Sequence, residues 1–128
     1  MNSVLWTYVA VAVGGAIGCC ARLGVTQAVQ TVYGRDFPLA TLVINVLGCL
    51  LVGFLFFATL ERLNVSPAMR AAIITGGLGG FTTFSTFAME SLLLIENGET
   101  ARAVLYVALS VVLGLTAAFM GAYIGRSL

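Results

Sequence analysis

Lysine and histidine are both absent from this 128-residue sequence, and charged side chains of any kind are scarce. Six arginines and five carboxylates make up only 9% of the residues, whereas 60% are hydrophobic. Soluble domains average about 25% charged residues, and a chain this poor in charge cannot cover a water-exposed surface. The composition therefore argues against an ordinary soluble domain and predicts a protein embedded in a lipid bilayer.

The same absences limit the chemistry that the chain can perform. The three cysteines, Cys19, Cys20 and Cys49, lie in hydrophobic runs without CxxC spacing, so neither a zinc site nor a disulfide framework is expected. Without lysine there is no P-loop, despite the glycines before residue 80. Without histidine there is no Ser-His-Asp set. We therefore expect no enzyme, and we expect no nucleic acid among its partners.

Charged residues divide the sequence into four hydrophobic runs. They cover residues 1–21, 37–60, 71–89 and 103–125, and each is near the 20 or so residues that cross about 30 Å of hydrocarbon. The runs predict a single all-α membrane domain over residues 1–128, with spans near 4–32, 38–60, 68–95 and 101–126. Asp36 and Ser66 lie close to prolines in the short connections, where N-caps of the following helices are expected.

The third run contains an unusual stretch over residues 75–87, Thr-Gly-Gly-Leu-Gly-Gly-Phe-Thr-Thr-Phe-Ser-Thr-Phe. Each glycine weakens a helix interior by about 1 kcal/mol relative to alanine, so we expect this helix to break near its middle, at 76–82. A bilayer tolerates broken backbone only where it is buried in protein or lines a water-filled cavity. The stretch is therefore a candidate site for binding or conduction.

Small residues at four-residue spacing indicate close helix contacts. Gly14 with Gly18, Gly76 with Gly80, and Gly121 with Gly125 each form a GxxxG pattern, which lets helix backbones approach closely. Some of these pairs must pack helices within one chain. Because four helices alone enclose little space for an aqueous path, we interpret the pattern as a sign of a dimer.

The arginines are almost evenly divided between the two ends of the spans. With four spans, both termini share a side with Arg62, Arg70 and Arg126. The other side carries Arg35 and Arg102, plus Arg22 if it lies nearer that end of the first span. The positive-inside rule then gives little preference for either orientation. We expect both orientations to occur, which permits a dual-topology, antiparallel homodimer. The alternative is that the terminal amino group and one extra arginine fix a single topology.

Several polar and aromatic residues within the runs are candidates for a site. An arginine inside a membrane is costly, so Arg22 is expected to be functional, unless its side chain extends to the interface. Asn45 can donate two hydrogen bonds, or it can simply join two helices. Phe84 and Phe87 share a helix face, where they either line a path or fill a core. Amides, hydroxyls, a guanidinium and phenyl ring edges together favour a small anion.

These motifs resemble those of the fluoride channels of the Fluc (CrcB) family. The resemblance rests on residues 77–87, Thr-Leu-x-x-Asn at 41–45, and Ala-Arg at 21–22, and it extends over all four spans. It implies an antiparallel dimer in the cell inner membrane with two fluoride pores and a central structural sodium ion. It also implies passive export of fluoride from the cytoplasm.

The resemblance also implies roles for individual residues. It places Gly79 and Thr82 at the sodium ion through their backbone carbonyls. Position 114 is glycine where some members of the family carry serine, which departs from the family's row of hydroxyls. The expected fluoride pathway consists of Phe84, Phe87, Asn45, Thr83, Ser110, Tyr106, Arg22 and Glu90.

Two other functions fit a small four-span chain. A dual-topology multidrug or cation exporter coupled to protons needs a carboxylate within the membrane, and the runs 1–21 and 37–60 contain none. A non-transporting assembly subunit would have no use for the polar residues 82–86. Efflux from liposomes separates all three functions.

Overall fold

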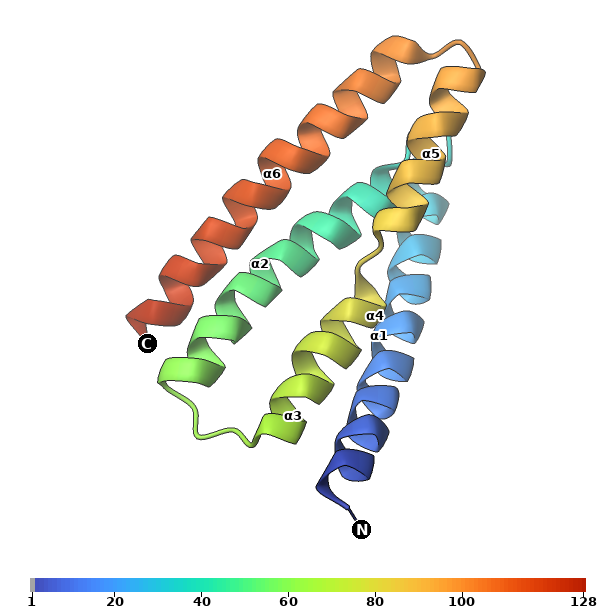
Figure 1. The fold of residues 1–128 in the computed structure, drawn as a ribbon. Helices are drawn as coiled ribbons and strands as arrows, with labels where there is room; N and C mark the ends of the chain where they lie inside the picture. The colour runs from blue at the N-terminus through green and yellow to red at the C-terminus, as the bar shows by residue number, and fades with distance from the viewer. Residues whose placement is uncertain (1) are drawn as a thin grey trace.

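A computed structural model describes residues 2–128 of the chain (Figure 1). Four helical segments in this part are long and apolar enough to cross a membrane, as the sequence predicts, and they cover Ser3–Tyr33, Leu39–Glu61, Pro67–Glu96 and Thr100–Ser127. Both termini lie at the same end of the bundle. In order, the elements are α1 (Ser3–Tyr33), α2 (Leu39–Glu61), α3 (Pro67–Ala71), the π-helix η1 (Ala72–Leu78), α4 (Gly79–Phe81), α5 (Phe84–Glu96) and α6 (Thr100–Ser127).

The third span consists of α3, η1, α4 and α5, and it is interrupted near its middle. The interruption is confined to Thr82 and Thr83, whose backbones are extended with ψ of 161° and 114°. The glycines at 76–80 remain helical within η1 and α4. The prediction of a broken third helix is therefore confirmed, but the break is narrower and later than expected. The glycines loosen the helix into a π turn without ending it.

Glycines hold the third span against α1 by direct contact between backbones. A methyl group on Gly14 would meet the carbonyl oxygen of Ala72, and one on Gly18 would meet that of Gly77. From the other side, a methyl group on Gly80 would meet the carbonyl oxygen of Gly15. The first two GxxxG patterns are thus used inside one chain, because only residues without a side chain permit this approach.

The second close helix pair is α2 with α6, which run in the same direction (Figure 1). Methyl groups on Gly121 and Gly125 would meet the carbonyl oxygens of Leu50 and Phe54, and Gly53 is packed in the same way against Ala118. The third GxxxG pattern therefore also serves packing within the chain. These glycines are in contact within one chain, and the dimer that their spacing suggested stays a prediction.

The connections are short, and only one of the two expected caps forms. Ser66 caps α3, since its Oγ accepts a hydrogen bond from the backbone N–H of Met69 at 3.3 Å. Asp36 does not cap α2, because that helix begins at Leu39 and Pro38 occupies the N-cap position without a side-chain hydrogen bond. The chain turns around the Phe37-Pro38 pair instead.

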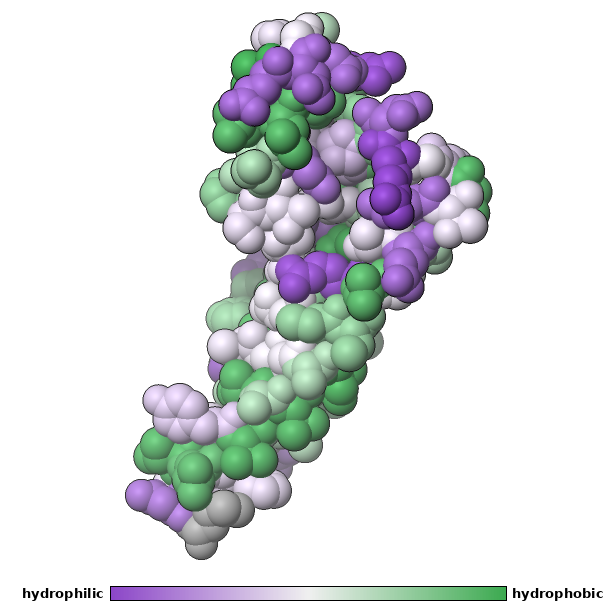
Figure 2. Space-filling model, turned by 90° about the vertical axis from the view of Figure 1, so that its right-hand side faces the viewer, coloured by the Kyte–Doolittle hydropathy of each residue, from purple (hydrophilic) through white to green (hydrophobic). Residues whose placement is uncertain are grey.

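Hydrophobic side chains cover much of the outer surface. Figure 2 shows hydrophobic residues over the lower part of one face and hydrophilic residues gathered at the upper end, away from the termini. The small buried core contains Leu42, Leu94, Ala103 and Tyr106. A soluble domain would instead expose mostly polar side chains, so this distribution suits a bundle surrounded by lipid.

Candidate functional site

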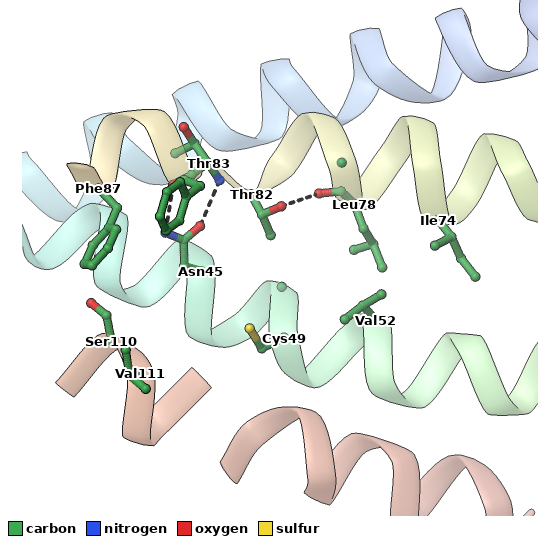
Figure 3. Close-up of a pocket in the computed structure, with 13 residues that line it drawn as sticks. Asn45, Cys49, Val52, Ile74, Leu78, Thr82, Thr83, Phe87, Ser110 and Val111 are labelled. Carbon is green, nitrogen blue, oxygen red and sulfur yellow. Dashed lines mark hydrogen bonds between the residues drawn. The ribbon is translucent and has the colours of Figure 1, made fainter. Parts of the chain in front are cut away.

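The break in the third span opens onto a hollow of about 420 Å³ between this span, α2 and α6 (Figure 3). We call it the break groove. It collects five residues of the expected fluoride pathway or sodium site from the third span, namely Gly79, Thr82, Thr83, Phe84 and Phe87, together with Asn45 from α2 and Ser110 from α6. Arg22, Tyr106 and Glu90 are not part of its lining.

Asn45 and Thr83 hold the broken backbone together. The Asn45 amide nitrogen donates to the Thr83 carbonyl oxygen at 3.0 Å, and the Asn45 side-chain oxygen accepts from the Thr83 N–H at 2.8 Å (Figure 3). In a continuous helix, that N–H would bond to the carbonyl of Gly79. Asn45 therefore joins two helices, as one of the two interpretations predicts, and it also frees the Gly79 carbonyl while it lines the groove.

The N-terminus of α5 lies at the groove. Thr83 is its N-cap, and the Thr83 Oγ1 accepts from the N–H of Thr86 at 3.3 Å. No acceptor within residues 2–128 is found for the backbone N–H groups of Phe84 and Ser85, the first two residues of the helix. Such a helix end carries a partial positive charge, so it favours a negative ion in the middle of the bilayer.

Phe84 and Phe87 lie side by side, with their ring centroids 5.5 Å apart. The Phe84 side chain is 78% exposed, so ordinary core packing does not explain it. Phe87 is half-buried and contacts the ring of Tyr106 at a centroid distance of 5.2 Å. The two rings thus lead from an open surface of the groove towards the buried core.

Ser110 carries a polar atom that the single chain leaves without a partner. Its Oγ is buried, and no group in the described residues hydrogen-bonds to it. In Figure 3 the hydroxyl points towards Phe87. A buried polar group without a partner costs about 1–3 kcal/mol, so this hydroxyl is available to a ligand that enters the groove.

Beyond Phe87, a chain of hydroxyls leads to Glu90. The fully buried Tyr106 donates its hydroxyl to Glu90 Oε2 at 2.7 Å, and Thr41 Oγ1 donates to Glu90 Oε1 at 2.9 Å. Thr41 is a partner that the sequence analysis missed, although it opens the Thr-Leu-x-x-Asn motif. Glu90 in turn lines a polar hollow of about 360 Å³ with Gln30, Arg35, Asp36 and Asn97.

Arg22 is directed at the break from α1. Its Nη1 donates to the carbonyl oxygen of Thr82 at 3.3 Å, and its Nη2 contacts the Cys19 Sγ at 3.8 Å. Arg22 is therefore neither a groove residue nor a side chain that extends to the interface. It supports the backbone at the break.

The sequence analysis also missed the thiol that lines the groove. Cys49 lies one turn beyond Asn45 on α2, and its sulfur would be 3.5 Å from a methyl group on Gly114. A single helical repeat from Asn45 could have found it. Its thiol thus occupies the neighbourhood in which the expected row of hydroxyls is interrupted by glycine.

Together, the four spans and the donor-rich break groove define an integral membrane protein with a site suited to a small anion. The family described as "CrcB-like protein, Camphor Resistance (CrcB)" matches residues 9–122, and the chain belongs to this family.

Curated relatives match this sequence along almost its whole length. A protein of Acidithiobacillus ferrooxidans (strain ATCC 53993 / BNL-5-31) is 54% identical over 94% of this chain and 97% of its own length. A protein of Magnetococcus marinus is 45% identical over 91% of this chain and 94% of its own. One of Aquifex aeolicus is 44% identical over 93% and 96%, respectively. All three are named "Fluoride-specific ion channel FluC".

Proposed function

We propose that this protein is a fluoride channel and not an enzyme. The observation that carries the proposal is the break groove, where the unpaired Ser110 hydroxyl, the N-terminus of α5 and the exposed Phe84 ring converge in the middle of the span. Each presents a hydrogen-bond donor or a positive edge, and none presents a negative charge. Relatives that are up to 54% identical carry the name of a fluoride-specific channel.

Fluoride accepts the strongest hydrogen bonds of the halides and also loses the most hydration on leaving water, so it needs a path rich in donors. On this proposal the ion passes from the groove along Phe84 and Phe87, exchanges hydrogen bonds with Ser110, and reaches Tyr106. The Glu90 carboxylate already accepts hydroxyls from Tyr106 and Thr41. Those two hydroxyls can turn from the carboxylate to the ion, and the polar hollow beyond them is then one mouth of the path.

An exporter that couples to protons is not favoured by this arrangement. Such a pump needs a carboxylate that exchanges protons in contact with its cargo. Glu90 is the carboxylate nearest the candidate path, and both of its oxygens are held by hydroxyl donors. Passive conduction requires no such exchange.

We further propose that the channel is an antiparallel homodimer. The single chain leaves the groove open on one side, with the Phe84 ring 78% exposed and Gly79 exposed beside it. A second subunit in the opposite orientation would close the groove and create a second, equivalent one. The nearly equal numbers of arginines at the two ends support insertion in both orientations.

A structural sodium ion fits the residues at the break. The Gly79 carbonyl loses its helical partner to Asn45, and the Thr82 carbonyl accepts only a 3.3 Å hydrogen bond from Arg22. Neutral oxygens suit a hard monovalent cation, and no group of three His, Cys, Asp or Glu side chains in residues 2–128 favours a transition metal. In the proposed dimer, each subunit would contribute these two carbonyls, and the ion would join the subunits.

The membrane we propose is the cell inner membrane, where an open fluoride path lets the ion leave the cytoplasm down its gradient. Purified protein in liposomes loaded with fluoride provides the test. With valinomycin present so that potassium leaves as the counter-ion, we expect rapid fluoride efflux at an ion-selective electrode without any proton gradient, and little efflux of chloride. Fluoride that stays inside, or that leaves only when a proton gradient is applied, would contradict a passive channel.

A further inference from the structure

Three arginines gather around a pair of phenylalanines at the end of the bundle that carries both termini. The guanidinium carbon of Arg126 lies 3.9 Å from the ring centroid of Phe57, and that of Arg70 lies 4.7 Å from the ring centroid of Phe56. The two rings contact each other edge to face at a centroid distance of 5.3 Å. Arg62 completes the group, which we call the arginine cluster, by donating to the Arg126 carbonyl oxygen at 3.0 Å.

The arginine cluster has no carboxylate partner. Within residues 2–128, the only ion pair joins Arg102 to Glu99 at 2.8 Å, at the opposite end of the bundle. Arg62 and Arg126 lie at the C-terminal ends of α2 and α6, where helix dipoles offset part of their charge. Arg70 lies near the start of the third span, where the dipole gives no such help. The cluster therefore keeps a net positive charge, with Glu61 beside Arg62 as the one carboxylate of α2 at this end, and it can bind an anion from outside the chain.

The guanidinium groups of Arg70 and Arg126 lie over phenyl rings, and neither side chain donates a hydrogen bond within residues 2–128. A guanidinium held by its face on an aromatic ring keeps its in-plane N–H groups for other acceptors. These N–H groups form a fork that matches two oxygens of one phosphate group. Two stacked guanidinium groups and the neighbouring Arg62 therefore present an arrangement suited to phosphate oxygens.

A hollow beside Arg70 indicates that the phosphate belongs to a lipid. It has a volume of about 300 Å³, and apart from Arg70 and Thr75 it is lined by Phe56, Pro67, Ala71 and Ile74. A free phosphate ion gains nothing from such apolar walls, whereas the glycerol and upper acyl chain of a phospholipid would fill them. Exposed aromatic side chains near both termini, Trp6, Tyr8 and Tyr123, are typical of the level of the lipid head groups.

We propose that the arginine cluster binds the phosphate of an anionic phospholipid, with the hollow beside Arg70 holding the apolar part next to the head group. The hollow shares only Ile74 with the lining of the break groove, and the site does not depend on the proposed channel function. If the chains pair in opposite orientations, each leaflet receives one such site. A difference in composition between the two leaflets would then act differently on the two subunits.

Native mass spectrometry of the purified protein, titrated with phosphatidylglycerol, tests the site. We expect phosphatidylglycerol affinity to fall about fivefold for each arginine replaced by glutamine in R62Q, R70Q and R126Q, since one arginine near a membrane surface contributes about 1 kcal/mol. The matched control is R35Q/R102Q, which removes two arginines from the other end and should leave lipid binding unchanged. Inorganic phosphate at millimolar concentration should not displace the lipid.

A second kind of variant keeps the proposal testable if the arginine variants do not fold. Phe57→Leu retains every charge but removes the surface on which Arg126 stacks, so it should weaken phosphatidylglycerol binding severalfold without loss of fluoride efflux. Equal lipid affinity in the arginine variants and the R35Q/R102Q control would overturn the site. Displacement by inorganic phosphate as effectively as by phosphatidylglycerol would overturn its assignment to lipid.

Discussion

Asn45 on α2 replaces, with two hydrogen bonds to Thr83, the backbone bonds that the third span loses at its break. The amide donates to the carbonyl at 3.0 Å and accepts from the N–H at 2.8 Å. A side chain from a different helix thus determines where this span stops being helical. The same contact fixes Thr83 as the N-cap from which α5, with Phe84 and Phe87, begins.

Replacing Asn45 with alanine should destabilise the protein, because the N–H and carbonyl of Thr83 would both lose their partner inside the membrane. The cost is about 1–3 kcal/mol for each group, and thermal unfolding in detergent measures it. The matched control is Gln27→Ala, which removes an exposed amide from α1. An Asn45→Ala protein as stable as the wild type would show that the break does not depend on this contact.

Phe84→Ile and Phe87→Ile should each slow fluoride efflux from liposomes by about tenfold, which corresponds to a loss of roughly 1.4 kcal/mol in stabilising the passing ion. Isoleucine is apolar but lacks the positive ring edge. Phe119→Ile is the control, because this ring is 76% exposed on α6 and is not part of the groove. Efflux unchanged in both groove variants would return the rings to a packing role.

Ser110→Ala should leave stability unchanged or slightly raised, since it removes a buried hydroxyl that has no partner in the chain. Fluoride efflux should nevertheless fall, because the ion would lose one donor along its path. Thr116→Val is the control, as it removes a hydroxyl that bonds to the Val112 carbonyl outside the groove. Normal efflux from Ser110→Ala would exclude this hydroxyl from the pathway.

Gly79→Ala and Gly18→Ala should destabilise different contacts, the first between subunits and the second within the chain. A methyl group on Gly79 meets nothing closer than the Ile74 carbonyl oxygen at 3.8 Å, so the single chain should fold. We expect Gly79→Ala to weaken the dimer. Replacing sodium with N-methylglucamine should weaken the wild-type dimer in the same way, and size-exclusion chromatography measures both effects. Gly18→Ala should destabilise the chain itself by about 1–3 kcal/mol, because it drives α1 away from the third span.

If Gly79→Ala forms dimers of normal stability in either cation, the proposed sodium site at this carbonyl loses its support. If the wild-type dimer is equally stable in sodium and in N-methylglucamine whereas Gly79→Ala weakens it, the interface depends on Gly79 and not on an ion.

Adding two lysines at the C-terminus should bias insertion towards one orientation and reduce fluoride efflux, since antiparallel partners would become rare. Co-expression with a variant biased the opposite way should restore efflux. A cysteine introduced at a terminus, labelled with a membrane-impermeant reagent before and after the cells are opened, measures orientation directly. Labelling of the native chain from one side only would contradict dual topology.

The four spans could be predicted because hydrophobic length is a local property of the sequence. The position of the break could not, because it depends on the distant pairing of Asn45 with Thr83, and glycines alone do not end a helix whose backbone is held against α1. Glycine spacing correctly indicated close backbone contacts but not their partners. The choice between a contact within the chain and one between chains requires the tertiary arrangement.

Among the site residues, those on one continuous motif were easier to find than those joined by folding. Phe84, Phe87 and Thr83 are adjacent in the sequence and lie together in the groove. Thr41 was missed because its role depends on Glu90, which is 49 residues away. The roles of all these residues in conduction stay predictions, since the geometry shows where they lie and not what crosses between them.

The helices of this chain pack in two units, and the boundary between the units lies inside the third span. η1 and α4 contact α1 chiefly, whereas α5 contacts α6 and α2, so the two halves of the third span belong to different packing units. The only backbone joint between these halves is the extended pair Thr82–Thr83. A movement of one packing unit relative to the other would therefore have to change the backbone at this joint, which lines the break groove.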